Sequence, residues 1–288
     1  MERELWPLLY RTVRAVAADF SEKYKQIPSW VLLLTMLWAA LHDRPIFWSC
    51  QAEHWKMTSL NLDRVPSPAT MSRRIDSVAV GWLWRAVEQR LRAMSPDVPG
   101  LLAFLDGKPL PVGGCTKDKD ARYGRAAGTM AKGYKLHVLW SNGPVPNAWE
   151  VTPLNADEAT VAQRLIPQLR GTGYLLGDGN YDVNALYDLA WQQGYQLVTP
   201  APKNPPGRRK QSPQRLHSIE LMGRPFGSSL YKNRIRIESR FGNATSFGGG
   251  LSPLPAWVRG LERVRTWVWA KLLINATRIL KEHGLRHL

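Results

Sequence analysis

The chain has 288 residues, and 39 lysines and arginines against 23 aspartates and glutamates give it a formal charge of +16. An apolar content of 44% excludes general disorder, two cysteines exclude a disulfide framework, and the longest apolar run, residues 30–41, is too short to cross a bilayer. Most of the excess charge lies in residues 201–288, which hold 17 basic and four acidic side chains. This imbalance favours nucleic acid as a partner.

The first third of the chain has the pattern of an all-α module. Apolar residues recur at spacings of three and four from Glu4 to about Leu91, and residues 30–41 are typical of a buried helix. Ser67 and Pro68 suit the start of a later short helix that contains Arg73 and Arg74. This helix fits the second helix of a helix-turn-helix, in which the two arginines contact DNA, and it fits an ordinary surface helix equally well.

A cluster of helix breakers at residues 95–100 marks a boundary. We therefore predict a helical DNA-binding module over residues 1–97 and an α/β domain over residues 98–288. Alternating strands and helices in the second region predict a mixed sheet flanked by helices. Residues 200–213, rich in proline and basic side chains, predict an extended, mobile loop. The expected strands are residues 101–105, 134–140, 149–152, 173–177 and 196–199, and the expected helices are residues 157–169, 183–193, 230–241 and 257–280.

Three carboxylates of this second region form a candidate metal site. Asp106 and Asp178 each follow a short apolar strand, at the sheet edge where ligand sites form. On a continuous helix, Glu238 shares one stripe with Tyr231 and Arg234. Clustered carboxylates repel one another, and a hard divalent cation such as Mg²⁺ or Mn²⁺ relieves that repulsion. Two such ions support phosphoryl transfer on a polynucleotide.

Each of these features also has a simpler explanation. Asp-Gly after a strand is a common turn, so either aspartate taken alone is more often a turn residue. Arg234 and Glu238 are spaced as a routine helical ion pair. The coincidence of three carboxylates with a basic final third favours the metal site.

Four blocks between residues 101 and 280 carry a family resemblance. They are Phe104–Leu110, Asp118–Arg125 with Lys132–His137, Leu176–Asp182, and Tyr231, Arg234 and Glu238 in the spacing Y-x2-R-x3-E. Together they resemble the DDE transposases encoded by bacterial insertion sequences, whose catalytic core has a ribonuclease H-like fold. The helical N-terminal module resembles them more loosely.

The resemblance implies that Asp106, Asp178 and Glu238 bind a pair of Mg²⁺ or Mn²⁺ ions. It also implies that Tyr231 and Arg234 grip the DNA strand beside the cleavage site, Arg234 through a bidentate phosphate contact. The family signature continues with a lysine where this chain has Thr245. Arg240 or another nearby base would then take over that phosphate contact.

Several other residues are weaker candidates for the metal site or are expected to serve packing. Asp182 is the main rival for the second ligand, and we prefer Asp178 because it follows the strand directly. Asp118 and Asp120 are weaker rivals that organise a basic loop. His137 is expected to lie in the core or just behind the site, and Trp267 and Trp269 are expected to serve core packing rather than DNA contact.

The resemblance implies a transposase that binds terminal inverted repeats of double-stranded DNA, cleaves the element's ends and transfers the freed 3′ end into target DNA. It would act as a homodimer or higher assembly in the bacterial cytoplasm, on the nucleoid and without a membrane. Two alternatives remain. One is a DNA-binding protein derived from a transposase without catalysis, an alternative that Thr245 in place of the family lysine keeps open. The other is a ribonuclease H-like nuclease that cuts without strand transfer.

Overall fold

The computed structural model describes residues 2–22, 26–56, 58–60, 62–95, 100–114, 116–126, 128–200, 211–247, 250–251 and 253–282. The chain divides into two compact units, the first made of Met1–Pro96, Asn243–Val258 and Thr266–Leu288, the second of Asp97–Gly242 and Arg259–Arg265. The C-terminal segments thus belong to the first unit, whereas the sequence pattern predicted them as part of residues 98–288. Most of the predicted breaker cluster and of the predicted mobile loop lies outside the described residues.

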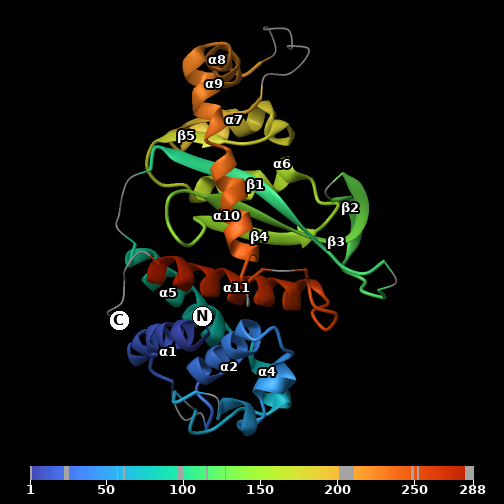
Figure 1. Cartoon of the computed structure of the whole chain (residues 1–288). Helices are drawn as coiled ribbons and strands as arrows, with labels where there is room; N and C mark the ends of the chain where they lie inside the picture. The colour runs from blue at the N-terminus through green and yellow to red at the C-terminus, as the bar shows by residue number, and fades with distance from the viewer. Residues whose placement is uncertain are drawn as a thin grey trace. The chain divides into compact units, whose positions relative to one another are not determined.

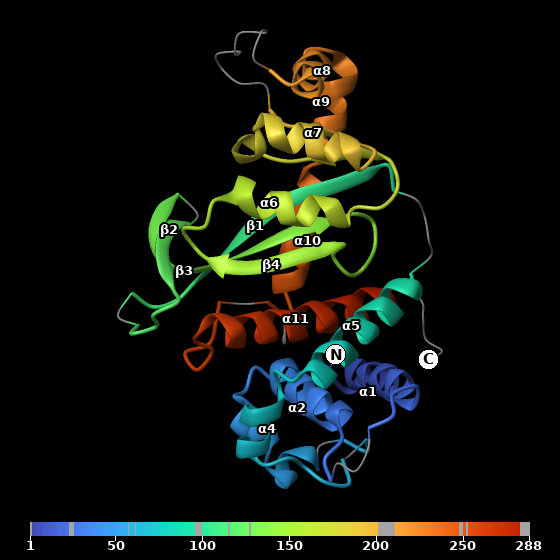
Figure 2. The same cartoon turned by 180° about the vertical axis from the view of Figure 1, so that it is seen from behind.

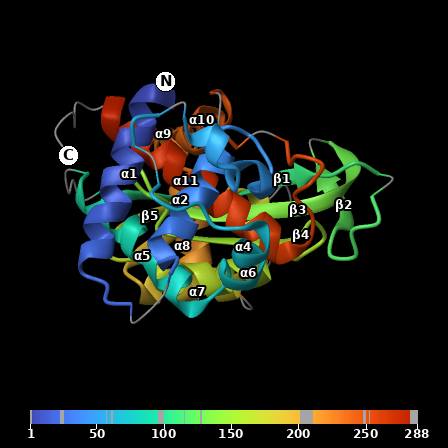
Figure 3. The ribbon, with the colours of Figure 1, turned by 90° about the horizontal axis from the view of Figure 1, so that it is seen from below.

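The first unit is built from helices. α1 (Glu2–Ala18), α2 (Ser29–Leu41) and α5 (Val78–Ala93) pack against one another (Figure 3), and α3 (Ile46–Ser49) and α4 (Pro68–Arg74) are short. Every residue of α2 except Trp30 is buried, which confirms the predicted buried helix. No helix in the described parts of the chain is long and apolar enough to cross a membrane.

The second unit contains a six-stranded mixed sheet. β1 pairs antiparallel with β3 and parallel with β5, and β5 pairs parallel with β6. Both β2 and β4 pair antiparallel with β3, along different parts of its length. The mixed sheet agrees with the predicted fold class. Its strands are β1 (Leu102–Pro111), β2 (Arg122–Ala126), β3 (Thr129–Trp140), β4 (Ala148–Pro153), β5 (Gly173–Leu176) and β6 (Tyr195–Val198).

Helices cover both faces of this sheet. α6 (Glu158–Leu165) and α7 (Asn184–Gln192) lie on one face, and α10 (Ile235–Thr245) crosses the other, as the two opposite views show (Figures 1 and 2). The core between the sheet and α6 and α7 includes Leu105, Leu165, Leu175 and Leu186. α6 passes into a 3-10 turn at Ile166–Gln168, so the α-helix ends before residue 169 because Pro167 cannot donate a helical hydrogen bond. α8 (Pro213–Met222) and α9 (Pro225–Lys232) complete the unit, with the first turn of α11 (Leu261–Glu282).

Two local predictions were wrong, and one strand was missed. β1 does not end at Asp106, because β3 keeps pairing with it from Phe104 opposite Trp140 to Pro111 opposite Gly133. β2 was not predicted, since its side chains are mostly exposed and lack a regular apolar alternation. The predicted helix over residues 230–241 is divided between α9 and α10.

Candidate active site

The two aspartates of the site come from neighbouring parallel strands. The pairing of β1 with β5 ends where Phe104 lies opposite Leu176, and Asp106 and Asp178 each stand two residues further on. Side chains alternate along a strand, so positions two residues beyond a matched pair lean to the same side. The Asp106 side chain is 14% exposed and that of Asp178 is 32% exposed. The sheet register thus places two half-buried carboxylates together.

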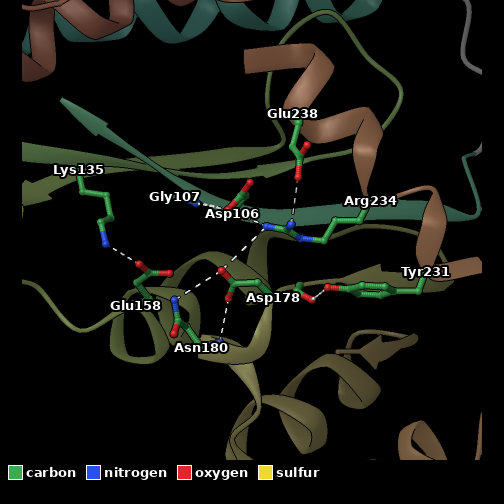
Figure 4. Close-up of polar contacts among 10 residues, drawn as sticks. Asp106, Gly107, Lys135, Glu158, Asp178, Asn180, Tyr231, Arg234 and Glu238 are labelled. Carbon is green, nitrogen blue, oxygen red and sulfur yellow. Dashed lines mark hydrogen bonds and ion pairs between the residues drawn. The ribbon is translucent and has the colours of Figure 1, made fainter. Parts of the chain in front are cut away.

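Arg234 joins these aspartates to Glu238. Its Nη2 lies 3.2 Å from Asp106 Oδ1 and 4.0 Å from Asp178 Oδ2, and its Nη1 lies 3.4 Å from Glu238 Oε1 (Figure 4). Glu238 is the outermost of the three carboxylates, with 62% of its side chain exposed. The structure therefore brings all three predicted carboxylates around one guanidinium group.

A tight turn between α9 and α10 positions Arg234. The backbone N–H of Arg234 donates to Tyr231 O, and that of Ile237 donates to Arg234 O, so both bonds span three residues rather than four. Asn233 Nδ2 donates to Leu230 O at 3.0 Å and so competes with the helical hydrogen bonds. Tyr231 Oη donates to Gly177 O at 3.1 Å, directly beside Asp178. Tyr231 and Arg234, which the sequence placed on one stripe with Glu238, thus reach the site from the turn between α9 and α10.

Burial disfavours the ionised forms of Asp106 and Asp178. It raises the pKa of Asp106 to about 6, although the positive charge of Arg234 works in the opposite direction. Burial also raises the pKa of Asp178, against the hydrogen bond from the Asn180 backbone N–H. The aspartates therefore experience less positive charge than their ionised forms require.

The donor set meets part of what a divalent cation needs. Carboxylate oxygens are the ligands that Mg²⁺ and Mn²⁺ prefer, and Asp106 and Asp178 already share one cationic nitrogen. Within the described residues, no group of three or more His, Cys, Asp or Glu side chains is arranged to hold a metal. Glu238 meets only the other terminal nitrogen of Arg234. The two aspartates fit a cation, and Arg234 stands between them and Glu238.

The rival carboxylates are engaged elsewhere. Asp182 forms a bidentate ion pair with Arg215, at 2.8 Å to Nε and 2.6 Å to Nη2. Asp118 Oδ2 accepts hydrogen bonds from Tyr134 Oη at 2.6 Å and from the Gly260 backbone N–H at 3.0 Å. Asp120 accepts from the backbone N–H of Leu261, the first residue of α11. These aspartates therefore anchor loops and a helix start.

His137 lies in the core, as predicted. It is 1% exposed, and its Nε2 lies 2.9 Å from Thr152 Oγ1. Burial lowers the pKa of His137 to about 4, so the ring is neutral at physiological pH. Trp267 is buried and Trp269 stacks on Trp84 with centroids 5.0 Å apart, which confirms the predicted packing role of both tryptophans.

The predicted DNA-binding arginines differ in their surroundings. Arg240 Nη1 donates to Gly143 O at 2.9 Å, its guanidinium lies 5.2 Å from the Trp140 ring centroid, and burial lowers the pKa of Arg240 to about 10. Both contacts hold its charge inside the second unit.

The two arginines of α4 also differ from each other. Arg74 Nη1 donates to Ile27 O at 2.6 Å, and Arg74 pairs with Glu22. Arg73 is exposed and donates only to Ala69 O of its own helix among the contacts seen. Ser67 caps this helix as predicted, since its Oγ accepts from the Thr70 backbone N–H. Of the two, Arg73 is better placed for an external partner.

One acidic residue near the site was missed by sequence reasoning. Glu158 is the first residue of α6 and forms an ion pair with Lys135 of β3. Its charge raises the pKa of both Asp106 and Asp178, where burial is the larger cause. An acidic residue at a helix start is ordinary helix capping, so no separate sequence signal marks Glu158.

Comparisons with known proteins define the class. The family profile described as "Transposase DDE domain" matches residues 99–274, more than half of the chain. The chain belongs to this family, and it is a DDE transposase.

Among solved structures, a cryo-EM structure of the piggyBac transposase synaptic complex with hairpin DNA aligns with 98% of this chain and 72% of that chain, at 11% identity and a TM-score of 0.48. A search of curated proteins found no match.

Proposed function

We propose that this transposase is catalytically active, cleaving DNA at the ends of an insertion sequence and joining the freed 3′ ends to target DNA. The observation that carries the proposal is the convergence of three carboxylates on Arg234, one from β1, one from the end of β5 and one from α10. In a DDE transposase, such a set is suited to phosphoryl transfer.

Asp106, Asp178 and Glu238 would hold the metal, Mg²⁺ or Mn²⁺ and two ions in all. When bound, a metal pair activates the attacking oxygen and stabilises the leaving oxygen of a phosphodiester. The raised pKa values of Asp106 and Asp178 support this assignment, because both carboxylates gain from an added positive charge. Arg234 takes the place of that charge in the structure.

Arg234 and Tyr231 would contact the DNA strand beside the cleavage site. Arg234 Nε is buried and has no hydrogen-bond partner within the described residues, so the guanidinium retains an unused donor. Released from the carboxylates, its planar fork is suited to a bidentate phosphate contact. Thr245, the last residue of α10, would leave one phosphate contact of the family to another base. Arg240 would first have to release Gly143.

The helical first unit would bind the terminal inverted repeats. We assign this role to α4 as part of a helix-turn-helix, with Arg73 facing the DNA and Arg74 supporting the helix through Ile27 and Glu22. Holding two element ends and a target together requires a homodimer or higher assembly on DNA. The proposed setting is the bacterial cytoplasm, at the nucleoid.

The test is a cleavage and strand-transfer assay on DNA that carries the element's ends, with Mg²⁺ or Mn²⁺. Asp106→Asn and Glu238→Gln should each lower the rate by on the order of 10²–10³-fold, because metal ligation supplies several kcal/mol of transition-state stabilisation. Glu262→Gln is the matched control, since Glu262 is 61% exposed and pairs with Arg265 one turn further along α11.

Full activity of Asp106→Asn or Glu238→Gln would refute the role of that residue. Cleavage without joining would instead indicate a nuclease, and metal-independent DNA binding with neither reaction would indicate a DNA-binding protein without catalysis.

A further inference from the structure

A fourth carboxylate faces the proposed metal site from the start of α6. Glu158 and its partner Lys135 are 15% and 10% exposed, so this ion pair is largely removed from water. Figure 4 shows the Glu158 carboxyl group with Lys135 on one side and Asp106 and Asp178 on the other. A buried ion pair with this orientation is poorly explained as surface charge.

Gly107 lies against the Lys135–Glu158 pair. A Cβ atom added at Gly107 would lie 3.0 Å from Lys135 Cδ and 3.8 Å from Glu158 Cδ. It would press on the stem of Lys135 and would be at ordinary contact distance from Glu158. The pair therefore packs closely against β1 at the residue next to Asp106.

Tyr181 lies in the same surroundings. Its hydroxyl is fully buried. Burial raises the pKa of Tyr181, and the charges of Glu158, Asp106 and Asp178, together with a hydrogen bond to Glu158, raise it further, so the phenol lies close to all three carboxylates. Carboxylates gathered around one buried phenol repel one another when ionised, and a bound cation relieves that repulsion.

Charge counting gives the kind of ligand. When ionised, Asp106, Asp178, Glu238 and Glu158 carry four negative charges, and Arg234 and Lys135 supply two positive ones. Once those two side chains are released, four negative charges remain, which two divalent cations balance. We propose that Glu158 is a fourth carboxylate of the metal site, whose charge Lys135 neutralises until a divalent cation binds. This inference rests on the proposed function of Asp106 and Asp178.

The experiment is a Mn²⁺ titration of the full chain without DNA. Binding is measured by calorimetry and by the electron paramagnetic resonance signal of free Mn²⁺. Glu158→Gln should weaken Mn²⁺ binding about tenfold or more, as loss of a carboxylate close to a metal does. Glu150→Gln is the matched control, because Glu150 lies on strand β4 and pairs with Arg164 of α6. Its Mn²⁺ affinity should equal that of the wild type.

Asp106→Asn separates the two proposals. If Asp106→Asn weakens Mn²⁺ binding and Glu158→Gln does not, Glu158 is no part of the site, whereas the proposed function stands. If Asp106→Asn also binds Mn²⁺ like the wild type, the metal site itself is wrong and this inference falls with it.

Lys135→Met keeps the test decisive if Glu158→Gln does not fold. Removing the lysine leaves Glu158 without its counter-charge, so the metal-free protein should unfold at lower urea concentration, and Mn²⁺ should bind more tightly and restore more stability than in the wild type. A purely structural ion pair would lower stability in Lys135→Met without any change in Mn²⁺ affinity, and that result would overturn the proposal.

Discussion

Arg234 provides the positive charge around which the three carboxylates lie. Arg234→Met should therefore destabilise the second unit by about 1–3 kcal/mol, because two half-buried aspartates lose their cation. Millimolar Mg²⁺ should recover most of the loss. Urea unfolding with and without Mg²⁺ measures both effects.

The exposed pair of Arg265 and Glu262 supplies the control for this prediction. Arg265→Met should change stability by less than about 0.5 kcal/mol, as is usual for a surface ion pair. An Arg234→Met protein that is as stable as the wild type without metal would show that the carboxylates do not depend on the guanidinium.

His137 makes stability depend on pH. Its pKa is held at about 4 by burial, below the ordinary value of 6.5, so the unfolded chain takes up a proton first as the pH falls. The stabilisation is complete above pH 6.5 and is lost between pH 6.5 and 4, to a total of roughly 3 kcal/mol. Its buried Nδ1 has no partner in the described structure to receive the added proton's charge. Urea unfolding between pH 7.5 and 5 measures the decline.

His137→Gln is the control for the pH effect. The amide does not titrate in this range, and it can still bond to Thr152, so the part of the decline due to His137 should disappear. Equal declines in the wild type and in His137→Gln would assign the pH dependence to other groups.

At the scale of elements, Asp118 connects β3 with the start of α11. Burial alone would raise the pKa of Asp118, but hydrogen bonds from Tyr134 and from the Gly260 backbone N–H prevail and lower it. Asp118→Ala should cost about 1–2 kcal/mol, because Tyr134 and Gly260 both lose a charged acceptor. Thermal unfolding measures the loss, and the exposed Asp76→Ala serves as the control. Equal stabilities of the two variants would contradict this role.

Sequence patterns predicted the elements that have a strong local signal. α2 and α7 follow from apolar spacing, and β3 and β4 from short apolar runs. The continuation of β1 beyond Asp106 was not predictable in this way, because it depends on pairing with β3, which lies later in the chain. At the break before α10, the Asn233 side chain bonds to Leu230 O and can compete with the helical hydrogen bonds, a contact that apolar spacing does not predict.

The sequence predicted those residues of the candidate site that belong to a recognisable motif. Asp106, Asp178 and Glu238 came from strand ends and from the Y-x2-R-x3-E spacing, and the structure gathers them around Arg234. Glu158 was not predictable, because its position depends on Lys135 from another strand and on the space beside Gly107. Such contacts are set by tertiary packing rather than by local sequence.

At the scale of the whole molecule, the formal charge of +16 overstates the charge available to DNA. In the second unit, Arg215 binds Asp182 and Arg240 binds Gly143. In the first unit, the buried Lys271 is bound by Asp43 and by Ala40 O. Contact with DNA should therefore depend on a smaller set of exposed basic residues, such as Arg73 and Arg236.

Neighbouring arginines of α4 test this distinction through the salt dependence of DNA binding. For each phosphate that the protein no longer neutralises, the negative slope of log K against log salt concentration becomes shallower by about 0.9. Arg73→Gln should therefore reduce the slope by about 0.9 between roughly 50 and 200 mM salt without changing stability. Arg74→Gln should leave the slope unchanged and lower stability instead, because Arg74 bonds to Ile27 and Glu22. Fluorescence anisotropy on end-containing DNA measures the slopes, and the opposite pattern would mean that α4 presents its other arginine to the DNA.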